Sequence, residues 1–212
     1  MTEIDAEFDL AGLDRWIDAK VKKQLPFAMA LSLTRTAQDA QTRTRGDLAA
    51  RFTIRRPFVA KGIRIKSARK SARLGDIKAQ VGTVDAFMAL QDAGGTKTGR
   101  GGGRVAVPVG ARPRQTSVTP RSKWPGALLK KPGHFLAPLA GEDGALGVWK
   151  RAGGKRRRGK ARGGQRRKLQ YVLTDSVDVP ARWQFEDTVS AVVASRHAGN
   201  FNAALARALG ET

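Results

Sequence analysis

The feature that most constrains this chain is an internal run of positive charge, KRAGGKRRRGKARGGQRRK, at residues 150–168. Its remaining residues are Ala, Gly and Gln, and it contains no acidic residue. Such a segment cannot bury apolar surface, so the fold must carry it as a surface loop supported by the segments on either side. Its eleven cations are Lys150, Arg151, Lys155, Arg156, Arg157, Arg158, Lys160, Arg162, Arg166, Arg167 and Lys168.

The run belongs to a wider asymmetry of charge. The 212 residues have a formal net charge of +22, whereas residues 1–50 hold seven basic and eight acidic residues and residues 182–212 hold three of each. The whole excess therefore lies in residues 51–181. A positive field of this kind attracts polyanions, and it indicates the class of partner rather than the fold.

Other classes of protein are disfavoured by composition. The chain has no cysteine and only two histidines, so we expect neither a disulfide framework nor a thiolate or histidine metal site, and no cofactor. The first residues, MTEIDAEFDLAGL, are acidic and do not resemble a secretory signal. No stretch approaches the length of apolar sequence that a membrane span needs, so we expect a protein made in the cytoplasm with no membrane partner.

Apolar residues spaced three or four apart predict helices at both ends of the chain. One stripe runs through residues 9–23, and a second through about 26–50. We expect a break between them, because Pro26 suits the first turn of a new helix. The last helix is predicted over about 183–209, with residues 199–200 as a candidate kink.

Between these helices the apolar period shortens to two, which predicts antiparallel β-strands with a basic solvent face. Residues 84–95 read as a short helix or turn, and residues 96–133 are rich in Gly and Pro. Because a strand stands on each side of the basic run, that run becomes the tip of a long hairpin. The predicted strands are FTIRR (52–56), GIRIKSA (62–68), KAQVGTV (78–84), VAVPV (105–109, at a sheet edge because of Pro108), HFLAPL (134–139), GALGVWKRA (144–152) and KLQYVLTDSVDVP (168–180).

These elements predict an α+β fold in which N-terminal helices and a C-terminal helix pack on an antiparallel sheet that carries a long basic hairpin loop. We expect a single domain over residues 1–212. Its parts are a helical segment (1–50), a basic β-rich segment (51–181) with flexible loops at 96–133 and 150–168, and the C-terminal helix (182–212).

No catalytic constellation stands out. GRGGGR (99–104) lacks the Lys-Ser/Thr of a phosphate-binding loop and leads into no predicted helix, so it is interpreted as a flexible loop. His134 and His197 have no carboxylate or nucleophile at a useful spacing, and are interpreted as packing or surface residues. Four acidic residues lie in turn-rich context and do not converge with other groups, namely Glu142, Asp143, Asp175 and Asp178. We therefore expect no enzyme.

Two patterns in the sequence are consistent with binding of nucleic acid. Three tryptophans each adjoin a basic residue, an arrangement that can stack bases, although amphipathic side chains at a sheet margin or subunit interface are favoured. The basic run is expected to bind phosphates without base readout, since nothing in it interleaves base-reading side chains. An acidic protein surface or plain solubility is the other interpretation of the run. The tryptophan pairs are Trp124 with Lys123, Trp149 with Lys150 and Trp183 with Arg182.

The N-terminal phrase KKQLPFAMALSLTRTAQDAQ (22–41) resembles the minor tail protein Z-like, or tail-completion, proteins of long-tailed bacteriophage necks. The end of the chain, YVLTDSVDVPARWQFEDTVSAVV (171–193) and HAGNFNAALARAL (197–209), is similar to the closing strand and final helix of that family. The family usually has Asn where Thr34 stands. The matching N-terminal positions are Gln24, Leu25, Pro26, Phe27, Ala28, Ala30, Leu33, Thr34, Thr36 and Ala37.

The resemblance implies a structural virion protein of the neck or tail, assembled in the host cytoplasm. It would form a ring homo-oligomer, with sixfold symmetry suggested by such tails, and would pass double-stranded DNA through its lumen. Its neighbours would be the connector, the tail terminator or the tail tube. Two alternatives stay open. One is a stand-alone, sequence-nonspecific nucleic-acid-binding protein of the ribosome or nucleoid, and the other, disfavoured, is an enzyme that remodels DNA or the cell wall.

Overall fold

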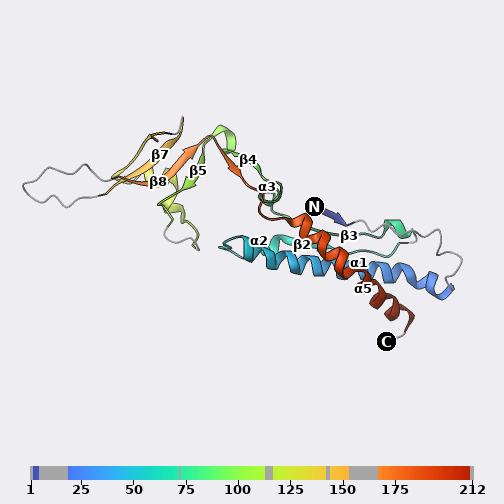
Figure 1. The fold of residues 1–212 in the computed structure, drawn as a ribbon. Coiled ribbons are helices and arrows are strands. Elements are labelled where there is room, and N and C mark those ends of the chain that lie inside the picture. Colours follow the sequence, from blue (N-terminus) through green and yellow to red (C-terminus); the bar gives the residue numbers. More distant parts are fainter. Residues whose placement is uncertain are drawn as a thin grey trace, which may run out of the picture. The chain divides into compact units, whose positions relative to one another are not determined.

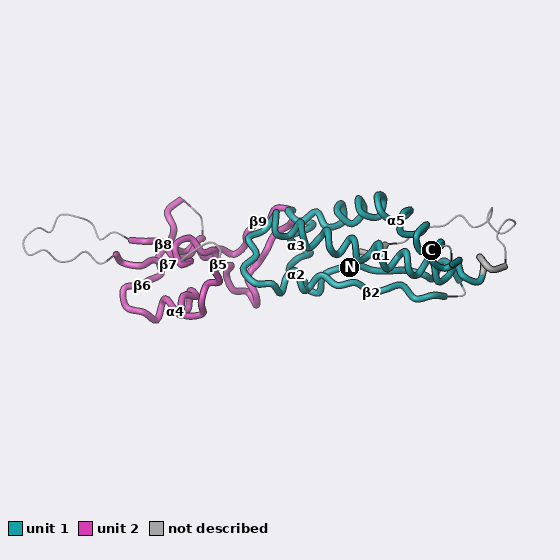
Figure 2. Tube along the Cα trace, turned by 90° about the horizontal axis from the view of Figure 1, so that it is seen from below, with its two compact units in different colours: residues 1–93, 181–212 teal, residues 94–180 magenta. Residues whose placement is uncertain are grey.

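The computed structural model of the chain describes residues 2–4, 19–71, 73–112, 117–141, 144–152 and 167–210. It divides into two compact units, shown in teal and magenta in Figure 2. Unit 1 comprises residues 1–93 and 181–212, and unit 2 comprises residues 94–180. That these two units fold as the single domain predicted over residues 1–212 stays a prediction.

In its described residues, unit 1 has two long helices, two short helices and three strands. They are β1 (Thr2–Ile4), α1 (Ala19–Arg51), α2 (Phe58–Gly62), β2 (Ile63–Lys66), a 3₁₀ turn (Leu74–Asp76), β3 (Ala79–Thr83), α3 (Phe87–Ala93) and α5 (Phe185–Leu209). The strands form one antiparallel sheet in the order β1-β3-β2. In Figure 1, α5 lies along α1, in agreement with the close contact between these two helices.

The core of unit 1 lies between α1, α5 and the sheet. Leu48 of α1, Ile63 of β2 and Val81 of β3 are almost completely buried, and Val189 of α5 joins the same cluster. A second cluster brings Leu33 and neighbouring α1 residues against the start of β3. The predicted α+β class, with terminal helices packed on antiparallel strands, is therefore confirmed. Within the described residues, no helix is both long and apolar enough to cross a bilayer.

The break predicted at residues 24–26 is wrong, because α1 continues through Pro26. Proline removes one backbone hydrogen bond and crowds the preceding turn, at a cost of about 3 kcal/mol. Leu25, Ala28 and Met29 on either side are buried in the core. Burial of Leu25 and Met29 contributes about 1.5–3 kcal/mol each, which together offsets the cost of the proline. The portion of the first predicted helix at 9–18 lies outside the described residues.

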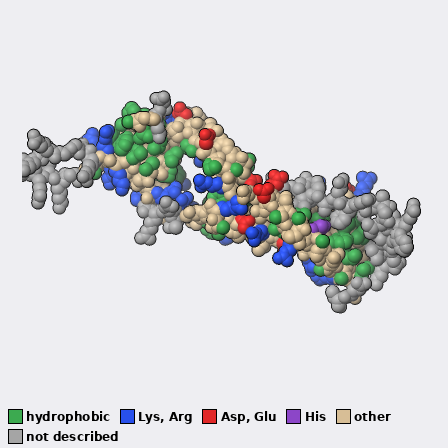
Figure 3. All heavy atoms as spheres, viewed as in Figure 1, with side chains coloured by type: hydrophobic (Ala, Val, Ile, Leu, Met, Phe, Trp, Pro, Cys, Tyr) green, Lys and Arg blue, Asp and Glu red, His purple; other side chains and the backbone are tan. Residues whose placement is uncertain are grey.

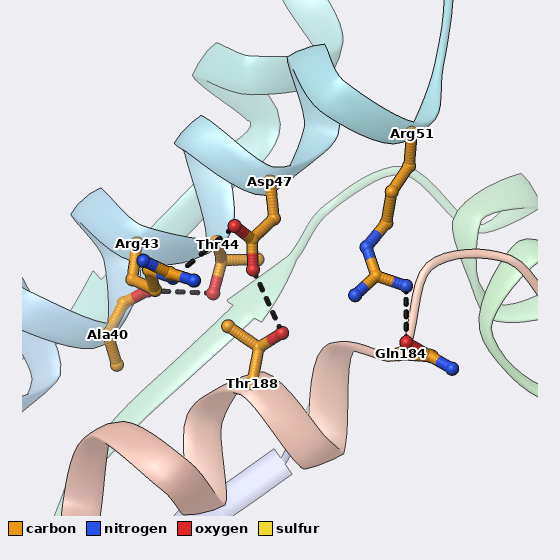
Figure 4. A network of polar contacts seen from close by, with 7 residues as sticks. All are labelled: Ala40, Arg43, Thr44, Asp47, Arg51, Gln184 and Thr188. Atoms are coloured by element: carbon orange, nitrogen blue, oxygen red, sulfur yellow. Dashed lines mark hydrogen bonds and ion pairs between the residues drawn. The ribbon is translucent and has the colours of Figure 1, made fainter. Parts of the chain in front are cut away.

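Polar side chains are built into the contact between α1 and α5. Thr44 donates to the carbonyl of Ala40 at 2.7 Å, which satisfies a buried hydroxyl within its own helix. Asp47 links the helices, because it accepts a 3.1 Å hydrogen bond from Thr188 of α5 and pairs with Arg43 at 3.3 Å. Figure 4 shows this network, together with the contact between Arg51 and Gln184.

The start of α5 receives its cap from another helix. Gln184, at the N-cap position, has a left-handed backbone (φ 53°) and no capping side-chain bond. Instead, the amide of Phe185 donates to the carboxylate of Asp92 in α3, at 2.7 Å. A carboxylate at this position satisfies a free amide and complements the helix dipole. The predicted C-terminal helix is confirmed, and it continues through residues 199–200.

One predicted strand in unit 1 is wrong. FTIRR (52–56) forms no strand, and it leads instead into α2. Phe52 and Ile54 are partly buried against the core cluster, so their apolar alternation reflects side-chain packing without backbone pairing. The strands predicted within 62–68 and 78–84 are confirmed as β2 and β3, and the short helix predicted within 84–95 is α3.

The part of unit 2 that the structure describes forms two antiparallel sheets, a four-stranded sheet in the order β5-β8-β7-β6 and a two-stranded sheet of β4 and β9. The predicted edge position of VAVPV is confirmed, because β5 stands at the end of the strand order and, among the described strands, pairs with β8 alone. Two elements inside the Gly- and Pro-rich segment 96–133, β4 and α4, were not expected. The elements of unit 2 are β4 (Gly95–Thr98), a 3₁₀ turn (Arg100–Gly102), β5 (Val105–Pro108), a 3₁₀ turn (Arg121–Lys123), α4 (Pro125–Leu129), β6 (His134–Pro138), β7 (Leu146–Arg151), β8 (Arg167–Thr174) and β9 (Ser176–Val179).

Candidate nucleic-acid interface

The basic run joins two paired antiparallel strands, so the predicted hairpin is confirmed at its base. Lys150 and Arg151 end β7, and Arg167 and Lys168 begin β8. Lys150 lies opposite Lys168, and Arg151 lies opposite Arg167. The other predicted site residues lie outside the described residues; they are Lys155, Arg156, Arg157, Arg158, Lys160, Arg162 and Arg166.

No described acidic residue neutralises the four cations at the hairpin base. Like charges placed directly opposite each other destabilise a strand pair. Among the residues that the structure describes, no carboxylate forms an ion pair with any of the four. The pairing of β7 with β8 therefore brings four positive charges close together.

One face of the sheet carries the two arginines, each over an aromatic ring. The guanidinium of Arg151 lies 5.4 Å from the ring centre of Phe135, and that of Arg167 lies 5.5 Å from the ring centre of Trp149. Such contacts hold an arginine in place while its hydrogen-bonding edge stays available. The sequence neighbour of Trp149, Lys150, points to the opposite face, because successive strand residues alternate.

The opposite face carries a row of basic side chains. His134 of β6 is the partner of Lys150, which is in turn the partner of Lys168. Lys123 and Lys131, from the segments before and after α4, line the same cavity as this row. Sequence reasoning named Lys123 only as the neighbour of Trp124 and did not name Lys131, because it assigned the site to the basic run alone. The three lysines of SKWPGALLKK (122–131) are nevertheless visible in the sequence as a second cationic segment.

Tyr171 of β8 positions Lys123. Its hydroxyl donates a 2.9 Å hydrogen bond to the carbonyl of Lys123, and its ring belongs to the core of unit 2 with Leu128 and Val148. Burial raises the pKa of the Tyr171 phenol above its ordinary value, and the positive charge of Arg112 opposes part of that rise. The phenol therefore keeps its proton, and its role as a donor, at neutral pH.

The other candidate residues do not assemble into a second site. His197 lies in α5 of unit 1, with its Nδ1 3.4 Å from the hydroxyl of Thr36. Asp175 pairs with Arg104 at 3.4 Å, and Asp178 accepts a 2.8 Å hydrogen bond from Thr96. Within the described ranges, no three His, Cys, Asp or Glu residues are grouped so as to hold a metal ion. Glu142 and Asp143 lie outside those ranges.

The remaining tryptophans differ in exposure. Trp183 is 2% exposed and belongs to the core of unit 1, so it is a packing residue. Trp124 is 52% exposed, and the guanidinium of Arg121 lies 5.8 Å from its ring centre. The segment 99–104 forms a turn between β4 and β5, and its left-handed glycines, Gly101 and Gly102, suit that turn.

The arrangement suits contact with a phosphate backbone. Lys and Arg side chains, blue in Figure 3, gather around the ends of β7 and β8. They comprise point charges on one face and stacked guanidinium groups on the other. One amide side chain, Gln170, lines the cavity with the lysines, and its Nε2 donates to the carbonyl of Lys168 at 3.5 Å, so the site is dominated by groups that contact phosphate rather than base edges. The charges and geometry of the site therefore suit electrostatic binding of a polyanion. No protein-family model, curated protein or solved structure matches this chain.

Proposed function

We propose that this chain is a non-enzymatic structural protein of a bacteriophage neck, which forms a ring and contacts double-stranded DNA through the base and tip of its basic hairpin. The observation that carries the proposal is the hairpin base, where Lys150 faces Lys168 and Arg151 faces Arg167. No described carboxylate neutralises these cations. Such a cluster suits a polyphosphate partner that it contacts through the phosphates alone, without base-specific contacts.

The neck placement rests on the sequence resemblance described above. It is supported by the fold, because a closed ring would repeat the positive hairpin in every subunit and so surround the lumen with a high density of positive charge. It is further supported by apolar side chains on unit 1 that stay exposed, namely Phe58, Val84 and Phe87. Exposed apolar groups of this kind mark surfaces that pack against another protein.

The first test measures binding to two unrelated duplexes of equal length over a range of salt concentrations. We expect equal affinity for both sequences and a steep salt dependence. The four substitutions Lys150→Ser, Arg151→Ser, Arg167→Ser and Lys168→Ser should together reduce the slope of log K against log salt by about 0.9 per lost phosphate contact, up to about 3.6.

A matched control removes two lysines and two arginines from unit 1, by substituting Arg64, Lys66, Arg69 and Lys70, all exposed, with Ser. This control should retain most of the salt slope. An equal loss in both variants would mean that net charge alone drives binding, and would contradict the assignment of the site.

The second test is the mass and position of the assembly. A ring oligomer in solution, with density for this chain at the head–tail junction of virions, is the expected result. A monomer that still binds DNA would instead indicate the stand-alone nucleic-acid-binding protein, and density on the tail exterior would contradict the neck placement.

A further inference from the structure

A cavity of about 310 Å³ opens on the face of the unit 2 sheet that carries Lys150. Its lining combines a row of three basic residues on neighbouring strands with two lysines from outside the sheet. Among the described residues, no acidic side chain lines it. The lining residues are Gly110, Ala111, Lys123, Leu128, Lys131, His134, Lys150, Lys168 and Gln170.

The short helix α4 brings Lys123 and Lys131 to the row. Leu128 of α4 is 5% exposed and packs with Val148 and Tyr171 on the sheet. Because the helix has five residues, the lysines before and after it both lie near the same sheet face. Two bonds fix the segments on either side, since Tyr171 holds the carbonyl of Lys123 and the amide of Lys131 donates to the carbonyl of Leu128 at 2.8 Å.

The opposite wall is rigid because of an irregularity in β8. At the bulge between the β7 and β8 registers, the carbonyl of Gln170 accepts from the amides of Val109, Gly110 and Ala111 at 2.9–3.3 Å. A Cβ atom at Gly110 would lie 2.5 Å from the carbonyl oxygen of Leu169, so only glycine fits this close approach. The wall is therefore set by the backbone.

The charge of the cavity calls for an anion. Lys131 donates from its Nζ to the carbonyl of Ser122 at 2.8 Å, which restrains the ammonium group without neutralising it. In the described part of unit 2, none of the four lining lysines forms an ion pair with a carboxylate. Like charges that share a small concave site repel each other until a ligand neutralises them, and the concave surface strengthens their joint field.

We propose that this cavity is a phosphate-binding pocket that holds one or two consecutive phosphodiester groups of a nucleic acid. The inference rests on the proposed function, and it assigns Lys123 and Lys131 to the interface. Lysine binds phosphate as a point charge, and the pocket has about the volume of ten water molecules, enough for a partly hydrated phosphate group but not for a folded partner. The same strands continue to Arg151 and Arg167, which favours a polymeric phosphate over a free one.

The test without any substitution is lysine acetylation of the full chain, followed by mass spectrometry, with and without duplex DNA. We expect saturating DNA to slow acetylation of Lys123 and Lys131 several-fold more than that of Lys97 and Lys130, which are exposed in the same unit and do not line the cavity. Unchanged acetylation of Lys123 and Lys131 in saturating DNA would overturn the pocket. If inorganic pyrophosphate protected Lys123 and Lys131 from acetylation and DNA did not, the pocket would bind free phosphate compounds, and the assignment of its ligand to a nucleic acid would be overturned.

The second measurement compares two double variants in salt-dependent DNA binding. Lys123→Met with Lys131→Met should reduce the slope of log K against log salt by roughly 1.8, whereas Lys97→Met with Lys130→Met should reduce it much less. Equal effects would overturn the pocket while leaving the hairpin proposal in place. If the unaltered chain bound DNA without salt dependence, the proposed function itself would fail, so the two failures are distinguishable.

Discussion

The hydroxyl of Tyr171 donates a 2.9 Å hydrogen bond to the backbone carbonyl of Lys123, and so joins strand β8 to the segment that leads into α4. The two residues are 48 positions apart in the sequence. This bond connects the core of unit 2 to its cationic surface, because the ring of Tyr171 is buried while Lys123 lines the lysine cavity. The stability of the fold and the geometry of the cavity therefore depend on the same phenol.

We expect Tyr171→Phe to destabilise unit 2 by about 1 kcal/mol, since the ring is kept and one buried hydrogen bond is lost. Hydrogen exchange should rise in peptides covering 121–129, which lose their connection to β8, and should stay unchanged in peptides of α1. Unchanged exchange in both regions would show that the bond does not hold the segment.

The same residue predicts how stability depends on alkaline pH. Burial raises the pKa of Tyr171, so the folded state favours the neutral phenol. This contribution is fully present below the ordinary pKa of 10.0 and is lost as pH rises through the raised value. Because the chain has one tyrosine, phenolate absorbance reports on it alone. We expect a midpoint above 10.0 in the folded protein and near 10.0 in urea, and equal midpoints would contradict the burial effect.

The hairpin was predictable from sequence because both of its determinants are local. Residues 144–152 and 168–180 alternate apolar and polar side chains, and the run between them cannot enter a core. Strand β4 was not predictable in this way. Its residues, GTKT, are all exposed, and they become a strand only through pairing with Ser176–Val179, far along the chain.

Nonlocal packing also explains the other differences. Pro26 is a local signal for a helix start, but the core residues on both sides of it keep α1 continuous. The four cations at the hairpin base could be predicted from composition. Lys123 and Lys131 could not, because their place beside Lys150 depends on α4 packing against the sheet.

The capping of α5 by Asp92 gives a third prediction about stability. Asp92→Ala should cost about 1 kcal/mol, because the amide of Phe185 loses its carboxylate partner at a helix N-terminus. Hydrogen exchange of the first turn of α5 should rise, while peptides near residues 200–209 change little. Asp76→Ala removes the same charge from a 3₁₀ turn of unit 1 and serves as the control. Equal effects of the two substitutions would indicate a general charge effect.

Acidic pH should destabilise unit 1 through His197. Burial lowers the pKa of this histidine below its ordinary value of 6.5, so the folded state binds fewer protons than the unfolded state. Its contribution to stability is therefore present above pH 6.5 and is lost as pH falls from 6.5 through the lowered value. Urea unfolding at a series of pH values should show this slope, and His197→Gln should flatten it. His134→Gln retains His197 and should keep the slope; if His197→Gln also keeps it, another group is responsible.

Self-association is expected to depend on an exposed aromatic pair in unit 1. Phe58 and Phe87 are each 50% exposed, with ring centres 6.3 Å apart, so together they present apolar surface to a neighbour. If the proposed ring packs through this surface, Phe58→Ser with Phe87→Ser should lower the mass of the assembly measured by sedimentation. The double variant would bury less apolar area when subunits associate, so association would be weaker. Val109→Ser with Leu136→Ser removes exposed apolar groups from unit 2 and is the control. An oligomer that survives the first pair of substitutions and dissociates with the second would place the subunit contact on unit 2 instead.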